Sequence, residues 1–297
     1  FETQDEVTLK RGDGGKALVL REKRGAKAVT RLRLRGAFDS PGEEVAAHLP
    51  AAFSPTLEQV VGDAPRDRLA LARWLVSAEN PLTARVAANR IWMELVGQSL
   101  IDTPEDFGVQ AQRPLHLDVL DWLATEFIRL GWSQKMLIRT IVMSSTYQRS
   151  AVATAEQLRL DPGNRFYGRS TRFRLDAERV RDTWLVAAGL LSRKIGGPSV
   201  YPLQADTSGV IPTNKVNMRW PTSKGEDRWR RGLYTYWRRT APFVAFKAFD
   251  ASSREVCQVR RERSNTPMQA LVGLNDPTAL AAAEALAQRM RTSVGDV

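Results

Sequence analysis

The sequence predicts a mainly α-helical protein of the α+β class, in which a multi-helix core carries a small N-terminal β segment and a β-like insertion before the last helices. Three changes of pattern along the 297 residues support this class. Residues 1–36 alternate apolar and polar side chains between glycine-rich turns, which is typical of short strands. From residue 65 onwards the apolar spacing becomes helical. A Pro- and Ser-rich excursion over residues 198–228 is followed by strand-like alternation over residues 228–250, and two helices then end the chain.

The N-terminal part is predicted to form strands followed by a connector. In the run TRLRLRG the side chains of Leu32 and Leu34 point to one side and the arginines to the other, which predicts a half-buried strand. Residues 46–62 form a connector punctuated by prolines. We therefore divide the chain into residues 1–60, a β-rich segment and connector that ends a preceding domain, and residues 65–297, a mainly helical domain.

Capping residues mark where the predicted helices begin and end. Asn80 caps a helix that starts with Pro81 and stops at Gly97. Ser133 caps a later one. The run RLDAERVRDTWLVAAGLLSRKIGG, which starts at Arg174, predicts one long helix that ends in a double glycine.

The run REVCQVRRERSNTPMQAL joins two kinds of structure. Its first half predicts a basic strand that delivers Arg260 and Arg261. Its second half predicts a helix capped by Asn265 or Thr266, with Pro267 in the first turn.

The charge of the chain is strongly positive and partly local. The formal net charge is +11 and the pI is about 10.2, and residues 219–263 hold twelve Arg or Lys against five Asp or Glu. Such a segment attracts phosphate, sulfate, uronate or an acidic protein surface. The alternative interpretation is that most of these arginines are solvated or paired within the protein.

Composition excludes several classes of protein. One cysteine excludes an internal disulfide framework. The absence of a CxxCH motif excludes a haem held covalently by this chain, and two histidines are too few for a His-rich metal site. No apolar run is long enough to predict a transmembrane segment. The chain begins at Phe1 rather than methionine, which we interpret as a processed or truncated start.

Short motifs occur in order from about residue 66 to about residue 289. They are NPLTARV from Asn80, NRIW from Asn89, DFG from Asp106, GWS from Gly131, STYQR from Ser145, DPGNR from Asp161, RLDAE from Arg174, GGPSV from Gly196 and REVCQVRRERSNTPMQAL from Arg254. Together they resemble the planctomycete cytochrome-associated domain of unknown function, the PSD-type C-terminal domain of proteins with a planctomycete-type cytochrome c domain. The number of motifs and their order make the resemblance specific.

The resemblance implies a setting and no reaction. Members form the C-terminal part of large exported proteins, so a periplasmic or extracellular location is expected. The implied partners are a cytochrome c-type domain, which would carry the haem, or the preceding domain of the same parent protein. The resemblance also implies a setting in which anionic, often sulfated, polysaccharides are broken down. The family also has no agreed catalytic residues, and here Gln112 or a neighbour replaces the acidic residue that usually precedes the histidine at His116.

Four side chains are candidates for catalysis, and the sequence leaves the catalytic residues unassigned. Arginines near Cys257 favour its thiolate, although a lone cysteine usually packs as a small apolar residue. His116 lies near a helix start and is either a cap or packing residue, or a proton carrier or axial ligand. Glu178 and Asp182 share a helix face, where they serve acid–base chemistry or join an ion-pair lattice.

Arginines and aromatic residues are interleaved before the last helices. The predicted anion-binding side chains are Arg230, Arg231, Arg238, Arg254, Arg260 and Arg261. The predicted aromatic platform consists of Trp229, Tyr236 and Trp237. Sugar-binding clefts and single-stranded nucleic acid sites both use this mixture, and so does a buried sheet edge with arginine–aromatic stacking.

These observations lead to three functional hypotheses. The first is a secreted accessory module that binds an acidic partner, either an anionic polysaccharide or a protein domain, through an arginine and aromatic surface. The second is an enzyme on anionic glycans, acting as a hydrolase, a lyase or a cytochrome-coupled oxidoreductase. The third, nucleic-acid binding, rests on the pI alone and ranks last because no nucleic-acid motif is present.

Overall fold

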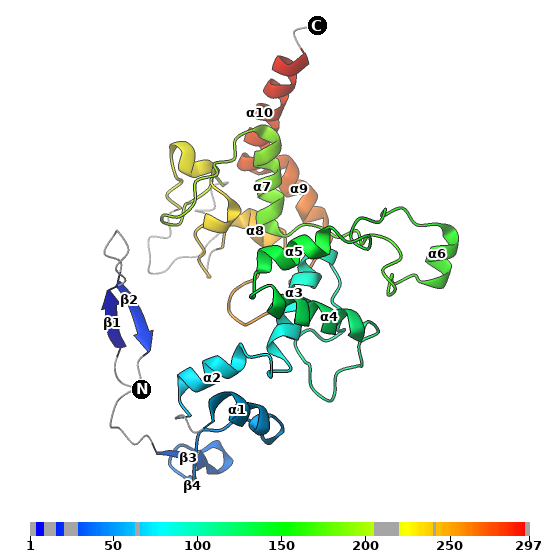
Figure 1. The fold of residues 1–297 in the computed structure, drawn as a ribbon. Helices are drawn as coiled ribbons and strands as arrows, with labels where there is room; N and C mark the ends of the chain where they lie inside the picture. The colour runs from blue at the N-terminus through cyan, green and yellow to red at the C-terminus, as the bar shows by residue number, and fades with distance from the viewer. Residues whose placement is uncertain are drawn as a thin grey trace. The chain divides into compact units, whose positions relative to one another are not determined.

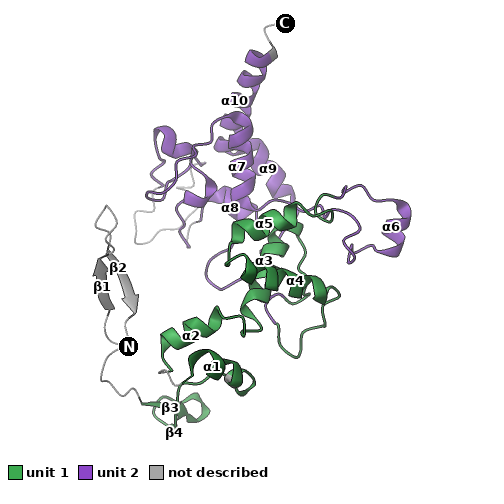
Figure 2. Cartoon of the chain, viewed as in Figure 1, with its two compact units in different colours: residues 1–103, 107–148 green, residues 104–106, 149–297 purple. Residues whose placement is uncertain are grey.

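The computed structural model describes residues 4–8, 16–20, 29–62, 66–204, 220–239 and 242–294. Within them it contains ten α-helices and four short strands, which confirms the predicted mainly helical class (Figure 1). The chain divides into two compact units, residues 1–103 with 107–148 and residues 104–106 with 149–297 (Figure 2). The boundary expected between residues 60 and 65 stays a prediction.

The strands form two antiparallel hairpins in the first unit. β1 (Gln4–Thr8) pairs with β2 (Lys16–Leu20), and β3 (Thr30–Arg33) pairs with β4 (Pro41–Val45). The prediction that β3 is half buried is wrong, because all four of its residues are exposed. A ribbon of two strands has too little surface to bury one of its own faces.

The predicted connector contains a helix. The 3-10 turn η2 (Ala51–Phe53) leads into α1 (Ser54–Val61), which packs on α2 (Arg68–Leu75). The Trp74 indole donates a hydrogen bond to Thr56 Oγ1 at 2.9 Å. Sequence reasoning missed α1 because its proline was interpreted as punctuation, whereas proline fits the first turn of a helix.

Three helices form the core of the first unit. They are α3 (Thr83–Val96), α4 (Leu117–Arg129) and α5 (Gln134–Val142). Their buried contact residues include Ala88, Leu120, Leu123, Phe127, Leu137 and Ile141. The predicted start is two residues early, because α3 begins at Thr83 with Leu82 at the N-cap position, although Asn80 Oδ1 accepts hydrogen bonds from the N–H groups of Leu82 and Thr83, each at 2.9 Å. The predicted end of this helix is confirmed: α3 stops before Gly97.

The second unit is built around α7 (Ala177–Ala188). The other helices are α6 (Ala155–Leu160), α8 (Val244–Ala248), α9 (Pro267–Asn275) and α10 (Pro277–Val294), with the 3-10 turns η3 (Gly225–Trp229) and η4 (Gly232–Tyr234). α7 contacts α10, α8 and η4. A small apolar core joins Ala177 of α7 to the buried aromatic residues Phe243 and Phe246.

α7 is shorter than predicted. The helix ends at Gly189, whose backbone is left-handed with φ +73°, and not at the double glycine that begins at Gly196. Arg289 of α10 donates hydrogen bonds to the carbonyls of Val186 and Ala187, so α10 supplies partners for two carbonyl groups in the last turn of α7. The sequence pattern carried no sign of this distant arginine.

The β-like insertion is mostly irregular. In the described part of residues 190–250, strand pairing is limited to the single-residue bridges Ser192–Arg230 and Val200–Thr235. The described ends of the predicted excursion are irregular as expected, apart from η3, and its residues 205–219 lie outside the described part of the chain. The start of α9 is confirmed: Thr266 occupies the N-cap position, and Pro267 is the first helical residue.

Candidate anion-binding site

α7 carries a row of carboxylates, which we call the acidic row: Asp176, Glu178 and Asp182. Each of them lies next to an arginine from a later segment of the second unit. Glu178 Oε2 is 2.5 Å from Arg261 Nη1, and Asp176 Oδ1 is 3.5 Å from Arg263 Nε. Asp182 Oδ2 is 3.7 Å from Arg231 Nε. An ion-pair lattice on this helix was one of the two interpretations of the sequence, but its main partners come from outside the helix.

Asp182 is the most constrained member of the acidic row. Its Oδ1 accepts a hydrogen bond from the Gly232 N–H at 2.6 Å and lies 3.9 Å from Arg181 Nη1. Burial raises the pKa of Asp182 above its usual value, although this hydrogen bond and the charges of Arg181 and Arg231 act against the shift. The carboxylate therefore helps to fix η4 against α7.

Two buried arginines organise the segment that passes over α7. Arg181 donates to the carbonyls of Arg230 at 2.7 Å and Arg228 at 3.0 Å, and burial lowers its pKa to about 10, so it remains charged at neutral pH. Arg230 is only 1% exposed, and its guanidinium carbon lies 3.7 Å from the centroid of the Tyr234 ring. It donates to three carbonyls of the GGPS loop: Lys194 at 3.4 Å, Pro198 at 3.1 Å, and Gly196. Arg230 thus stabilises a loop and is not positioned to meet an external anion.

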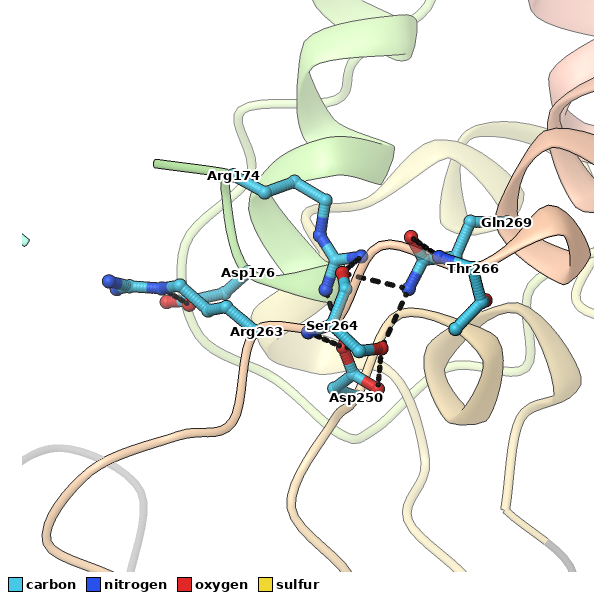
Figure 3. Close-up of polar contacts among 7 residues, drawn as sticks. All are labelled: Arg174, Asp176, Asp250, Arg263, Ser264, Thr266 and Gln269. Atoms are coloured by element: carbon cyan, nitrogen blue, oxygen red, sulfur yellow. Dashed lines mark hydrogen bonds and ion pairs between the residues drawn. The ribbon is translucent and has the colours of Figure 1, made fainter. Parts of the chain in front are cut away.

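Asp250 and Ser264 lie at the two ends of an arginine-rich segment and are joined by hydrogen bonds. Ser264 donates its N–H to Asp250 Oδ2 at 2.8 Å and its hydroxyl to the same carboxylate. Arg174 donates to Asp250 Oδ2 at 2.6 Å, and Gln269 donates to Ser264 at 3.3 Å (Figure 3). We call this group the Asp250–Ser264 clamp. The clamp brings together two positions that are 14 residues apart.

The clamp makes stability depend on pH. Partial burial acts to raise the pKa of Asp250, but the hydrogen bonds from Arg174 and Ser264 outweigh it and hold the pKa below its usual value of 3.8. A lowered pKa in the folded state gives stability that is fully present above the unfolded pKa and lost as the pH falls through the folded one.

We expect Asp250→Asn to remove this dependence. Above pH 5 the variant should be less stable than the wild type by about 1–3 kcal/mol, because its amide cannot pair with the Arg174 charge. The difference should shrink as the pH falls below about 4, where the wild-type carboxylate becomes protonated. Urea unfolding at a series of pH values measures the loss of stability above pH 5 and the decrease of that loss at low pH. Parallel stability curves for the two proteins would contradict the assignment.

Residues 251–263 form an exposed loop, which we call the arginine loop. The prediction of a basic strand here is wrong, because these residues have no regular structure. The expectation that Cys257 packs is wrong as well, since its side chain is exposed. The basic side chains that suggested a strand instead make side-chain contacts: Arg261 and Arg263 pair with Glu178 and Asp176, and Arg254 lies over Trp237.

The predicted aromatic platform divides into two parts. Tyr236 and Trp237 are half-buried, and each carries an arginine over its ring: the guanidinium carbon of Arg238 is 5.8 Å from the Tyr236 centroid, and that of Arg254 is 4.8 Å from the Trp237 centroid. We call these four residues the aromatic–arginine surface. Trp229 lies in η3 with Arg228 near its ring.

Sequence reasoning missed two rings behind this surface. Tyr201 stacks on Tyr236 with centroids 4.7 Å apart, and Trp220 meets Tyr201 edge to face at 5.1 Å. Trp220 in turn stacks on the buried Phe243 at 5.8 Å. The available signal was weak: these two half-buried aromatic residues lie within the Pro- and Ser-rich excursion over residues 198–228.

The four catalytic candidates occupy different surroundings. Glu178 and Asp182 lie one turn apart on α7, each bound to groups from later segments. Cys257 lies on the arginine loop. His116 belongs to the first unit, where it precedes α4 and its carbonyl accepts the Leu120 N–H at 3.2 Å.

The described residues show neither a metal site nor a membrane-spanning helix. No group of three or more His, Cys, Asp or Glu side chains there is arranged to hold a metal ion. In the same part of the chain, every helix is too short or too polar to cross a bilayer.

The fold and the site define a mainly helical protein in which one carboxylate-bearing helix organises arginines from two later segments. The model of the PSD1 family, proteins of unknown function (DUF1553), matches residues 67–296. The chain therefore belongs to this family, which confirms the resemblance drawn from its motifs. Neither a curated protein nor a solved structure matches the chain.

Proposed function

We propose that this protein is a non-catalytic accessory module that binds an anionic polysaccharide through the aromatic–arginine surface. The observation that carries the proposal concerns two consecutive half-buried rings, each of which has an arginine over it. Arg238 lies over Tyr236, and Arg254 lies over Trp237. A sugar ring stacks on an aromatic face, while a guanidinium pairs with sulfate or carboxylate in a planar geometry. On this surface a guanidinium already lies over each ring, so the rings hold Arg238 and Arg254 in place for an anion, and a sugar would contact what remains exposed of the rings.

The rings behind the surface support a preformed site. Because Tyr236 stacks on Tyr201, which contacts Trp220, the half-buried Tyr236 ring is fixed before a ligand arrives. A fixed ring loses little conformational freedom on binding. Trp237 is held in the same way, since it packs against the α8 core and its indole donates to the Ser253 carbonyl at 3.3 Å.

The acidic row supports a binding role over acid–base catalysis. Glu178 lies beside the Arg261 charge, and Asp182 accepts the Gly232 N–H, so both carboxylates already have partners within the protein. In the same proposal, the module works outside the cytoplasm as part of a cytochrome-linked parent protein, and any haem lies on a partner domain. These last points rest on the family resemblance alone.

Affinity electrophoresis tests the proposal. Native gels would contain heparin as a sulfated polymer, polygalacturonate as a uronic polymer, or neutral dextran. The wild type should be retarded by the two anionic polymers and not by dextran. Mobility-shift assays with single-stranded DNA give the affinity for nucleic acid, for comparison with the affinity for the glycans. Tighter binding to DNA than to the glycans at equal salt would overturn the proposal.

A charge-matched pair of double variants locates the site. Arg238→Gln with Arg254→Gln removes two charges from the aromatic–arginine surface. Arg73→Gln with Arg113→Gln removes two charges from exposed positions in the first unit. Only the first variant should lose most of the retardation, by roughly tenfold or more in affinity if each contact contributes about 1 kcal/mol. An equal effect of both variants would mean that net charge alone drives binding.

A further inference from the structure

The carboxylates of the acidic row already pair with arginines of the same unit, in the way that an external anion could. Arg261 and Arg263, two of the loop's four arginines, pair with carboxylates of α7. Arg231, from η4's N-terminal side, pairs with a third. Three carboxylates at the start and on the first turns of α7 thus pair with arginines from two later segments, and an external anion could pair with the same arginines.

The three pairs differ in how easily an external anion can replace the carboxylate. Arg263 and Asp176 are mostly buried, with 20% and 9% of their side chains exposed, and the clamp holds the neighbouring residue (Figure 3). Arg261 is 35% exposed and Arg231 is 51% exposed. Ion pairs that reach solvent contribute little net stability, so exchange of partner costs little there. Arg261 and Arg231 are therefore the exchangeable arginines.

The arginine loop is anchored in a way that allows such an exchange. Its two ends are joined by the Asp250–Ser264 clamp, and Arg254 lies over Trp237. These anchors do not involve Arg261. The Arg261 side chain can therefore change partner while the loop remains attached to the second unit.

We propose that Glu178 is an intramolecular competitor that occupies Arg261, and that a sulfated or uronic polymer bound at the aromatic–arginine surface gains Arg261 as an additional contact by displacing it. This inference rests on the proposed function and adds its regulation. Glu178 lowers affinity for weakly charged polymers, because they cannot displace it. It discriminates in favour of polymers with closely spaced anionic groups, because a second anion close to the first competes at high effective concentration.

The test uses the affinity of the full chain for heparin. Glu178→Gln should bind heparin roughly threefold or more tightly than the wild type, because the polymer no longer competes with the Glu178 carboxylate for Arg261. Glu262→Gln removes the same charge from an exposed residue of the arginine loop and should give a smaller gain. The double variant Glu178→Gln with Arg261→Gln should lose the gain, since the released cation is absent.

Two outcomes would overturn the inference. The first is a gain in Glu178→Gln no larger than that in Glu262→Gln. The second is a gain that persists in the double variant. If no protein in the series, the wild type included, binds heparin, the proposed function itself fails, and the two failures are thereby distinguished.

A second comparison covers the case in which Glu178→Gln does not fold. Arg261→Gln in the wild-type background should lose less heparin affinity than Arg260→Gln, because Arg260 is exposed whereas Arg261 is held by Glu178. Equal losses would show that Arg261 is a permanent contact and would overturn the inference. Melting curves recorded on the same samples confirm that each variant is folded.

Discussion

Replacing Arg230 by methionine is expected to destabilise the second unit by about 2–4 kcal/mol, because hydrogen bonds from a charged donor each contribute about 1.5–3 kcal/mol and several are lost together. Methionine fills much of the same volume but donates no hydrogen bond. The carbonyls of Lys194, Gly196 and Pro198 would lose the charged donor that holds this loop on the second unit. The stacking of the guanidinium on Tyr234 would be lost too.

Thermal unfolding of three variants measures this effect. Arg230→Met should lower the melting temperature by roughly 6–15 °C for a chain of this size. Arg230→Lys keeps the charge but cannot reach three carbonyls at once, so it should give an intermediate loss. Arg239→Met, at an exposed position close by, is the control and should stay near the wild-type value. The account of Arg230 is contradicted if Arg230→Met melts with the control.

Gly232→Ala is expected to produce the second large effect. A Cβ atom at this position would lie 2.9 Å from both Cα and Cβ of Glu178 and 3.0 Å from its carbonyl oxygen. Because two of these atoms belong to the backbone of α7, they cannot move aside cheaply. The close approach also places the Gly232 N–H on Asp182. We expect a loss of about 1–3 kcal/mol from overpacking.

Gly168→Ala is the matched control for this prediction. An added Cβ there would meet nothing within 4 Å, and the residue does not have a positive φ. Urea unfolding should therefore separate the two glycine variants clearly. If Gly232→Ala unfolds at the same urea concentration as Gly168→Ala, η4 does not lie against α7 as described.

Local signals in the sequence predicted the parts of the fold that depend on neighbouring residues. Thr266 marks a helix start because a cap acts on N–H groups two or three residues away, and Asn80 lies within three residues of another helix start. Gly97 marks a helix end for the same local reason. The mainly helical class followed from apolar spacing, which reports one face of each element. None of these predictions needed knowledge of the tertiary packing.

The candidate site depended on distant contacts and was predicted less well. Nothing in the run RWRRG distinguishes the buried Arg230 from the exposed Arg231, because the carbonyls that bind Arg230 lie more than 30 residues away. The end of α7 at Gly189 did have a local signal, a left-handed glycine, but the Arg289 side chain that binds the last-turn carbonyls comes from α10. Charge counting over residues 219–263 overestimated the open basic surface, since the acidic row on α7 lies outside that window.

The central claim is that the aromatic–arginine surface binds an anionic polymer through direct arginine contacts. Its most direct test is the salt dependence of heparin affinity, measured between about 50 and 300 mM salt, where each neutralised anion adds nearly one to the log–log slope. We predict that Arg238→Gln with Arg254→Gln lowers the slope by about two, whereas Arg73→Gln with Arg113→Gln leaves it unchanged. Equal slopes for the wild type and both double variants, or no binding at any salt concentration, would contradict the account.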